Sequence, residues 1–364
     1  MSLKKFRDHL LERVLTLLWK QWTALGIPGG EKLDKNLVLD PESLLVFSLQ
    51  IARYEPRLFD EILSWLATND HWLDASRLRN ILKRQGKNEA RVVGGALQFA
   101  LQETGSHKWE KLTEQFRVGH AKGSKKSIAK LSSDIFKQQP RADSVEPLFK
   151  EKSGKFHPLV LKEKEEPSFM IFFLNRPPIK NLKEAQGVPV NATTNIRFLL
   201  RALFGVGSRS ECILYLLTHL GGHPREMAEA IGLFWLGVQQ ILVDLAASGL
   251  VQIRSKANKS EYWIPQKKWW GFLSSQEAET VQMAKWLSWI PIYESLLHLW
   301  NFVDELSRSE ESDYMKSSKM KDSLEILSKG FSHAGLEMPS LPKNEISSAF
   351  LEKFVNEALG KIGA

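Results

Sequence analysis

Apolar side chains recur at the spacing of one helix face along most of this chain. The first run ends at the glycine-rich stretch 26–30, and Pro41 and Pro56 stand where first helical turns are expected. Because residues three or four apart lie on the same face of a helix, this spacing predicts amphipathic helices rather than strands. We expect helices over 3–25, 41–54, 56–67, 74–83, 88–102, 275–308 divided in two at Pro291, 315–330 and 344–360.

A different order of elements is predicted between residues 209 and 265. Gly232 stands between two helical runs, where a tight turn needs a residue that tolerates a left-handed backbone. The spacing of Val238, Leu242 and Leu245 indicates the buried face of the helix that follows. The expected elements are helices over 209–220, 223–231 and 234–248, a strand over 250–254, a polar turn, and a second strand over 261–264.

This order of helix, helix, glycine-containing turn, helix and basic hairpin resembles the winged helix-turn-helix family, in the style of the ArsR- and MarR-type bacterial regulators. The matching residues are 225–231 for the first helix of the motif, Gly232 and Leu233 for the turn, and 238–250 for the next helix and its end. The resemblance extends over about residues 195–265 only. It implies a winged helix with a two-stranded β wing.

The chain as a whole is therefore expected to be mostly α. A helical N-terminal domain precedes the central winged helix-turn-helix, and a helical C-terminal domain follows it. The expected boundaries are 1–116 for the helical N-terminal domain, 117–192 for a basic linker and possible hairpin, 193–270 for the winged helix-turn-helix, and 271–364 for the helical C-terminal domain.

The segment expected to be a linker is rich in positive charge. Between residues 117 and 141 the basic side chains outnumber a single acid, Asp134. A solvated linker is the interpretation we favour, and an arm that contacts phosphates is the alternative, since lysines along a nucleic-acid backbone gain from counterion release. The apolar runs that begin at Pro158 and Phe169 form the possible hairpin.

Composition narrows the class of protein. The net charge of +8 over 364 residues is compatible with a polyanionic partner. The single cysteine, Cys212, excludes an internal disulfide framework and a cysteine zinc finger, and suits a reducing compartment. No apolar run is long enough to span a membrane, and residues 1–20 lack the pattern of a secretory signal. We expect a cytoplasmic protein.

No catalytic or metal site is predicted. Cys212 and His219 are two helical turns apart, roughly 10 Å along the axis, which is too far for bonds of about 2 Å to one ion. His223 lies beyond a pair of glycines, so the helix does not fix its direction. Phosphate-binding loops, dinucleotide-binding glycine motifs, zinc-protease and hydrolase signatures are missing. We expect no enzyme, no cofactor and no metal.

The resemblance implies a nucleic-acid site. In that family the recognition helix enters the major groove and the wing meets the backbone. Glutamine side chains can pair with adenine edges, and arginine and lysine side chains hold phosphates. The implied base-facing residues are Trp235, Leu236, Gln239, Gln240 and Val243, and the implied phosphate-binding residues are Arg225, Arg254, Lys256 and Lys259. The predicted function is a dimeric transcriptional regulator that binds double-stranded DNA.

The start of the recognition helix supports an alternative. Phe234, Trp235 and Leu236 occupy positions where base-reading helices usually carry polar side chains, and exposed apolar patches more often meet protein. The alternative is a non-catalytic, antitoxin-like or scaffolding subunit that docks a homodimer mate or another protein through these three residues. An electropositive surface over residues 234–243 favours DNA, and a hydrophobic one favours protein.

Aromatic and basic residues also meet at residues 267–270, with the sequence Lys-Lys-Trp-Trp. Lysines beside tryptophans can hold phosphates and stack on bases. Tryptophans are also common core anchors, and we favour packing of this pair onto the neighbouring helices.

Overall fold

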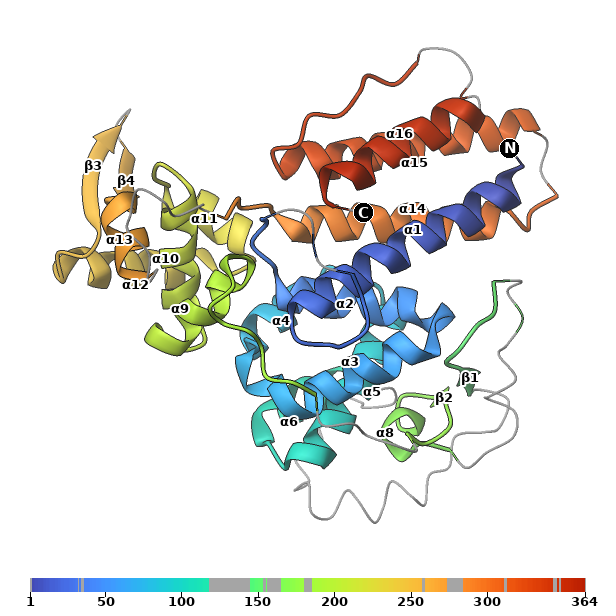
Figure 1. The fold of residues 1–364 in the computed structure, drawn as a ribbon, viewed down its shortest axis with the longest axis horizontal. Helices are drawn as coiled ribbons and strands as arrows, with labels where there is room; N and C mark the ends of the chain where they lie inside the picture. Colours follow the sequence, from blue (N-terminus) through green and yellow to red (C-terminus); the bar gives the residue numbers. More distant parts are fainter. Residues whose placement is uncertain are drawn as a thin grey trace. The chain divides into compact units, whose positions relative to one another are not determined.

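The computed structural model is mostly helical (Figure 1). It describes residues 2–31, 33, 36–117, 145–152, 155, 165–179, 185–256, 259–273, 284–310, 313–342, 346 and 348–363. The chain forms two compact units, each built from separate stretches of sequence. The first unit comprises Met1–Phe47, His71–Ile81 and Gly187–Ala364, and the second comprises Ser48–Asp70 and Leu82–Gln186.

Four helices of the first unit lie side by side (Figure 1). The hydroxyl of Ser2 caps the first of them by accepting a hydrogen bond from the Lys5 backbone N–H. Tyr293 connects the second of these four helices along the chain to the first, because its hydroxyl donates to the side chain of Gln21 at 2.8 Å. Its ring also stacks on Phe47. The four helices are α1 (Leu3–Ala24), α14 (Trp289–Leu306), α15 (Asp313–His333) and α16 (Ser348–Lys361).

The expected division of a helix at Pro291 is wrong. A single helix, α14, begins at Trp289, and Pro291 lies in its first turn. Backbone N–H groups of the first turn have no partner within a helix, so proline is tolerated there and the helix continues through it.

The second group of elements in the first unit packs around its own apolar core. Val238, Leu242 and Leu245 are buried in it, as the sequence predicts. The strands β3 and β4 pair antiparallel, with Gln252 opposite Trp263 and Lys256 opposite Lys259. The elements are α9 (Ile196–Phe204), α10 (Ser208–Thr218), α11 (Pro224–Ile231), α12 (Trp235–Ala247), β3 (Gln252–Lys256), β4 (Lys259–Trp263) and α13 (Gln266–Leu273).

The second unit is built around α5. Gly94 and Gly95 leave no side chain on one side of this helix, so the rings of Phe172 and Phe169 pack directly against its backbone. The helices and strands of this unit are α3 (Pro56–Asn69), α5 (Lys87–Thr104), α6 (Glu110–Phe116), β1 (Glu146–Pro147), α8 (Pro167–Met170) and β2 (Leu174–Asn175).

The described part of the expected hairpin has a different structure. Phe169 lies in the short helix α8, where Pro167 occupies an N-terminal position and the side chain of Glu166 accepts from the Ser168 backbone N–H. The strand that follows, β2, pairs in parallel with β1. The run that begins at Pro158, and most of the basic linker, lie outside the described residues.

The remaining elements are short connections and two helices near the unit boundaries. Pro41 occupies the first position of α2, as expected. These elements are α2 (Pro41–Ile51), α4 (Ala75–Leu82), and the 3-10 turns Ala52–Tyr54, Asp70–Trp72, His107–Trp109 and Thr193–Asn195.

Candidate functional site

The outer side of α12 is exposed and largely apolar. Leu236 and Val243 are 52% and 45% exposed, and they lie seven residues apart on the side opposite Val238 and Leu242. Phe234, directly before the helix, is 64% exposed. Gln239 and Gln240 lie between the apolar positions on the same outer side. We call the surface formed by Phe234, Leu236, Gln239, Gln240 and Val243 the α12 stripe.

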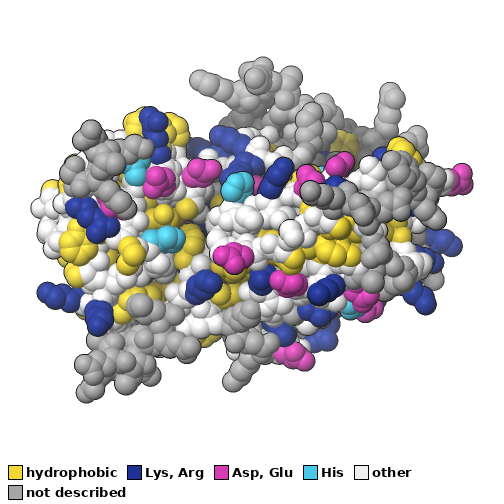
Figure 2. All heavy atoms as spheres, turned by 90° about the horizontal axis from the view of Figure 1, so that it is seen from above, with side chains coloured by type: hydrophobic (Ala, Val, Ile, Leu, Met, Phe, Trp, Pro, Cys, Tyr) yellow, Lys and Arg dark blue, Asp and Glu magenta, His cyan; other side chains and the backbone are white. Residues whose placement is uncertain are grey.

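The charges near the α12 stripe are mainly acidic. Asp244 is the only charged residue of α12, and the helix contains neither lysine nor arginine. On α11, two acids, Glu226 and Glu229, and one base, Arg225, are exposed. Figure 2 shows acidic side chains among the basic ones on the face it presents. The two helices therefore carry three exposed acids and one exposed base, although the whole chain has a net charge of +8.

The first turns of α11 and α12 meet through a cation–π contact. The guanidinium of Arg225 lies 5.0 Å from the ring centroid of Trp235. Trp235 is half-buried and packs against the core of this region. Arg225 and Trp235, both predicted to touch nucleic acid, are thus brought together, with the tryptophan directed partly inward.

The two glutamines are exposed, and one is already engaged. The Gln240 side-chain amide donates to Asp244 at 2.9 Å, one helical turn along. This bond uses one of the donors with which Gln240 could pair with an adenine edge.

The hairpin places Arg254 beside an acid. Its Nε donates to Glu261, its cross-strand partner, at 2.6 Å, and its Nη2 donates to the Leu220 carbonyl at 3.2 Å. Arg254 is exposed, yet its charge is balanced locally. Lys256 and Lys259 are Cα partners at the end of the hairpin, and their side chains lie outside the described part of the structure.

A backbone bridge connects the hairpin to the start of α11. The backbone N–H of Gly222 donates to Tyr262, and that of Tyr262 donates back, at 2.9 and 3.0 Å. The preceding glycine, Gly221, leaves room for the hairpin, because a Cβ there would lie 3.0 Å from the Tyr262 carbonyl oxygen. The hairpin is therefore held against the helices rather than projecting on a free loop.

The aromatic pair of α13 packs inward, as favoured from the sequence. Trp270 is buried and donates from Nε1 to the Leu217 carbonyl at 3.3 Å. Trp269 is half-buried, with its ring 6.1 Å from that of Phe204. Lys267 and Lys268 remain exposed.

Cys212 lies in the core, and His219 is half-buried near its edge. Cys212 is fully buried, and burial raises the pKa of its thiol to about 12, with a smaller contribution from Glu211. His219 stacks on Tyr215 with ring centroids 3.8 Å apart, and burial lowers its pKa. In the part of the chain that the structure describes, no three His, Cys, Asp or Glu side chains form a group able to hold a metal ion.

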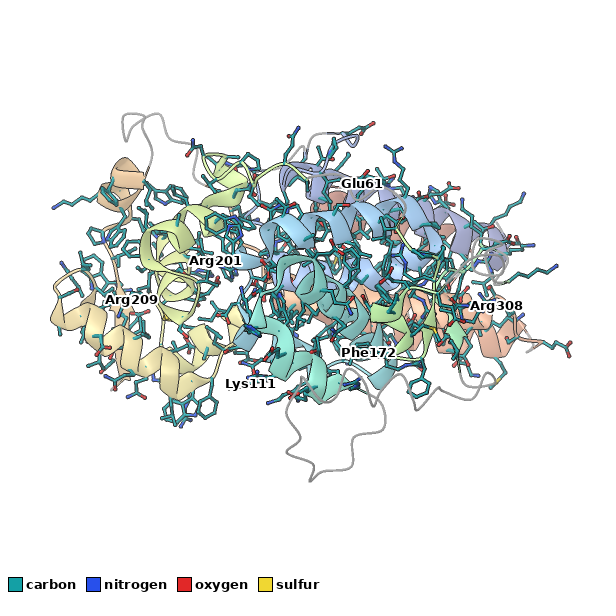
Figure 3. The ribbon with its side chains drawn as sticks, turned by 90° about the horizontal axis from the view of Figure 1, so that it is seen from below. Glu61, Lys111, Phe172, Arg201, Arg209 and Arg308 are labelled. Atoms are coloured by element: carbon teal, nitrogen blue, oxygen red, sulfur yellow. The ribbon has the colours of Figure 1, made fainter. Side chains whose placement is uncertain are left out.

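A network of six buried charged side chains lies in the first unit and was not anticipated from the sequence. Arg201, labelled in Figure 3, donates to Glu42 at 2.7 Å and to Glu211 at 2.6 Å. Arg77 donates to Glu42 at 2.6 Å and forms a bidentate pair with Asp40. Such pairs are favourable only when each charge is matched and hydrogen-bonded. The members are Asp40, Glu42, Arg77, Arg197, Arg201 and Glu211.

The electrostatics of the network follow from these pairs. Burial by itself raises the pKa of Glu42, but the charges of Arg201 and Arg77 outweigh it and lower the pKa to about 2. Asp40 shows the same balance, because Arg77 and Arg197 overcome burial and hold its pKa well below the usual range. Both carboxylates are therefore ionised in the folded protein near neutral pH.

One signal in the sequence could have pointed to part of this network. Arg197 and Arg201 are four residues apart in a helix that is otherwise apolar, so they share one face of α9. Their partners Asp40 and Glu42 are more than 150 residues away, and no local pattern connects them.

Among the described residues, no single helix is long and apolar enough to cross a membrane, and α11 with α12 passes that test only as a pair bent by 118°. No family model matches the chain, and neither a curated protein nor a solved structure is found to be similar to it.

Proposed function

We propose that this protein is a non-catalytic interaction subunit, in which α10–α12 and the β3–β4 hairpin form a winged helix that docks a partner protein through the α12 stripe. The observation that carries the proposal is the composition of the stripe. Its exposed side chains are apolar or amide-bearing, and α12 contains no basic residue. A DNA backbone needs positive charge at this position, whereas protein interfaces have apolar centres with few charges.

The winged-helix arrangement is supported by several described contacts. Three helices precede an antiparallel hairpin in the expected order, and Gly232 ends α11 in the left-handed conformation. The bridge between Gly222 and Tyr262 attaches the hairpin to the segment before α11. The three predicted core residues of α12 are buried.

Charge complementarity indicates the chemistry of the partner. The exposed acids Glu226, Glu229 and Asp244 lie on the two helices that carry the stripe, with Arg225 drawn over Trp235. A face-to-face second copy would bring these acids toward one another, which is unfavourable. The occupant is therefore a segment of a different protein, with an apolar helix face edged by lysine or arginine.

The test uses a synthetic amphipathic helix of leucine and lysine as the probe, with a leucine–glutamate helix of the same pattern as its control. We expect the lysine peptide to bind more tightly, as measured by fluorescence anisotropy. Replacing Phe234 with alanine should weaken this binding by more than about tenfold, because a truncated interface aromatic typically costs at least about 2 kcal/mol.

Phe272→Ala is the matched control, since Phe272 is 70% exposed but lies on α13. It should leave peptide binding unchanged. Equal losses in the two variants would contradict the proposal, and so would a dimer that depends on Phe234. Specific DNA binding that falls by about 1–3 kcal/mol when Gln239 and Gln240 become alanine would instead favour the DNA-binding regulator predicted from the sequence.

A further inference from the structure

The turn between α11 and α12 receives hydrogen bonds from a helix that is distant in the sequence. Nε of Arg77 donates to the carbonyl of Ile231 at 2.6 Å, and Nδ2 of Asn80 donates to the carbonyl of Gly232 at 3.2 Å. Both donors belong to α4 and are three residues apart, so they lie on the same face of that helix.

These two carbonyls need hydrogen-bond donors from outside α11. The last carbonyls of any helix have no N–H within the helix to bind. The N–H groups of Gly232 and Leu233 return to the earlier carbonyls of Glu229 and Ala228. The carbonyls of Ile231 and Gly232 are therefore left for α4, and the charge of Arg77 also interacts favourably with the negative end of the α11 dipole.

Arg77 is itself held in one orientation. Asp40 binds both of its terminal nitrogens, and Glu42 binds one of them. The side chain is completely buried, so no water competes for these bonds. With the terminal nitrogens fixed, Nε is directed at the turn.

Helix α14 also contacts the turn. Gly232 has φ of +72°, and a Cβ at this position would lie 2.9 Å from Cδ1 of Ile290. The turn is therefore bounded by α4 through hydrogen bonds and by α14 through packing.

We infer that Arg77 and Asn80 are positioning residues, and that α4 acts as an external C-terminal cap that holds the α11–α12 turn and so sets the direction in which α12 presents its outer stripe. Neither residue touches the stripe, and the inference holds whatever the stripe binds. It predicts that loss of the α4 donors loosens the turn locally while the core of α10 stays intact.

Asn80→Asp is the test variant because it keeps the shape of the side chain and replaces the amide donor with an acceptor. Ser76→Asp is its control, since Ser76 is exposed and the same charge enters the same helix. Amide hydrogen exchange is measured along the full chain. In Asn80→Asp we expect the amides of Gly232 and Leu233 to exchange about tenfold faster, as for a buried carbonyl left unpaired.

In Asn80→Asp, the amides of α10 should exchange at the same rate as in the unmodified protein. In the control Ser76→Asp, all amides should exchange at that rate. Asn80→Ala, which removes the donor without adding charge, should accelerate the same two amides. The inference would be overturned if the Gly232 and Leu233 amides of both Asn80 variants exchanged within about twofold of their rate in the unmodified protein. An equal acceleration in α10 would also overturn it, because the effect would then be loss of global stability.

Discussion

Cys212 illustrates how a single residue can be reactive by type and inert by position. It is the only thiol in the sequence and has no exposed surface in the core around α10–α12. Burial, with a smaller effect of Glu211, raises the pKa of the thiol to about 12. The nucleophilic thiolate is thus almost absent near neutral pH, and reagents cannot reach the sulfur.

We therefore expect the folded protein to react with Ellman's reagent at least about a thousandfold more slowly than a free cysteine near neutral pH. The released chromophore is followed by absorbance. In concentrated denaturant the same sample should release one equivalent rapidly, matching the single cysteine. Rapid labelling of the folded protein would show that Cys212 is accessible.

At the scale of elements, α12 and its preceding turn contain two glycines with opposite roles. Gly237 lies in the first turn of α12, and an added Cβ there meets nothing within 4 Å. Gly232 has a left-handed backbone and a close neighbour in Ile290. The helix therefore needs glycine at the turn and not inside the helix.

Gly237→Ala should raise the free energy of unfolding by about 0.5 kcal/mol, because alanine loses less backbone entropy than glycine on forming a helix. Gly232→Ala should lower it by more than about 1 kcal/mol, since alanine is strained at positive φ and its Cβ would press on Ile290. Denaturant unfolding measures both changes. Shifts of the same sign in the two variants would contradict this account of the turn.

At the scale of the whole chain, the buried charges join segments that are far apart in sequence. Asp40 directly precedes α2, Glu42 lies in its first turn, Arg77 comes from α4, and Arg201 comes from α9. All these side chains belong to the first unit and are almost fully buried. The cost of removing one partner is high because the remaining charge stays buried without its match.

Because of these buried ion pairs, the free energy of unfolding depends on pH. The pKa of Glu42 is about 2 in the folded protein, below its ordinary value of 4.5, and that of Asp40 is lowered in the same direction. A lowered pKa in the folded state stabilises the protein above the unfolded pKa, and this contribution is lost as the pH falls toward the folded value. We expect the free energy of unfolding to decrease by a few kcal/mol between about pH 5 and pH 2.

Glu42→Gln separates this effect from general acid denaturation. The variant should be less stable than the unmodified protein near neutral pH, and the difference should shrink as the pH falls below about 4.5, where the native carboxylate begins to lose its advantage. Urea unfolding at several pH values supplies the measurement. A difference that stays constant down to about pH 3 would exclude Glu42 as a contributor.

The sequence by itself determined the local elements. Apolar spacing predicted α1, α3 and α5 nearly to their ends, and Pro56 marked the start of α3, because helix periodicity and the rigidity of proline act over a few residues. The same reasoning gave the order of α10–α12 and the hairpin, with Val238 and Leu242 inward. It failed at Pro291, which lies in the first turn of a helix rather than dividing one. It also failed at Phe169, which lies in a short helix rather than in the strand of a hairpin.

Both the composition and the outward direction of the α12 stripe were visible in the sequence, because the inward spacing of Val238 and Leu242 leaves Leu236 and Val243 on the opposite face. The structure alone shows that Trp235, expected on the same outer face, is half-buried against the core beneath Arg225. The sequence predicted that Arg254 binds phosphate. In the structure, the register of the hairpin places Glu261 opposite Arg254, and the two side chains form a hydrogen bond.

Only the tertiary structure decided where the charges of the first unit are buried and what holds the α11–α12 turn. Arg77 and Asp40 are 37 residues apart in sequence, and Arg77 and Ile231 are 154 apart. No local pattern records such pairs, because burying a charge is favourable only once its partner arrives from another segment. Short-range sequence rules therefore specify the helices, and long-range charge matching specifies how α4 meets the turn that aims α12.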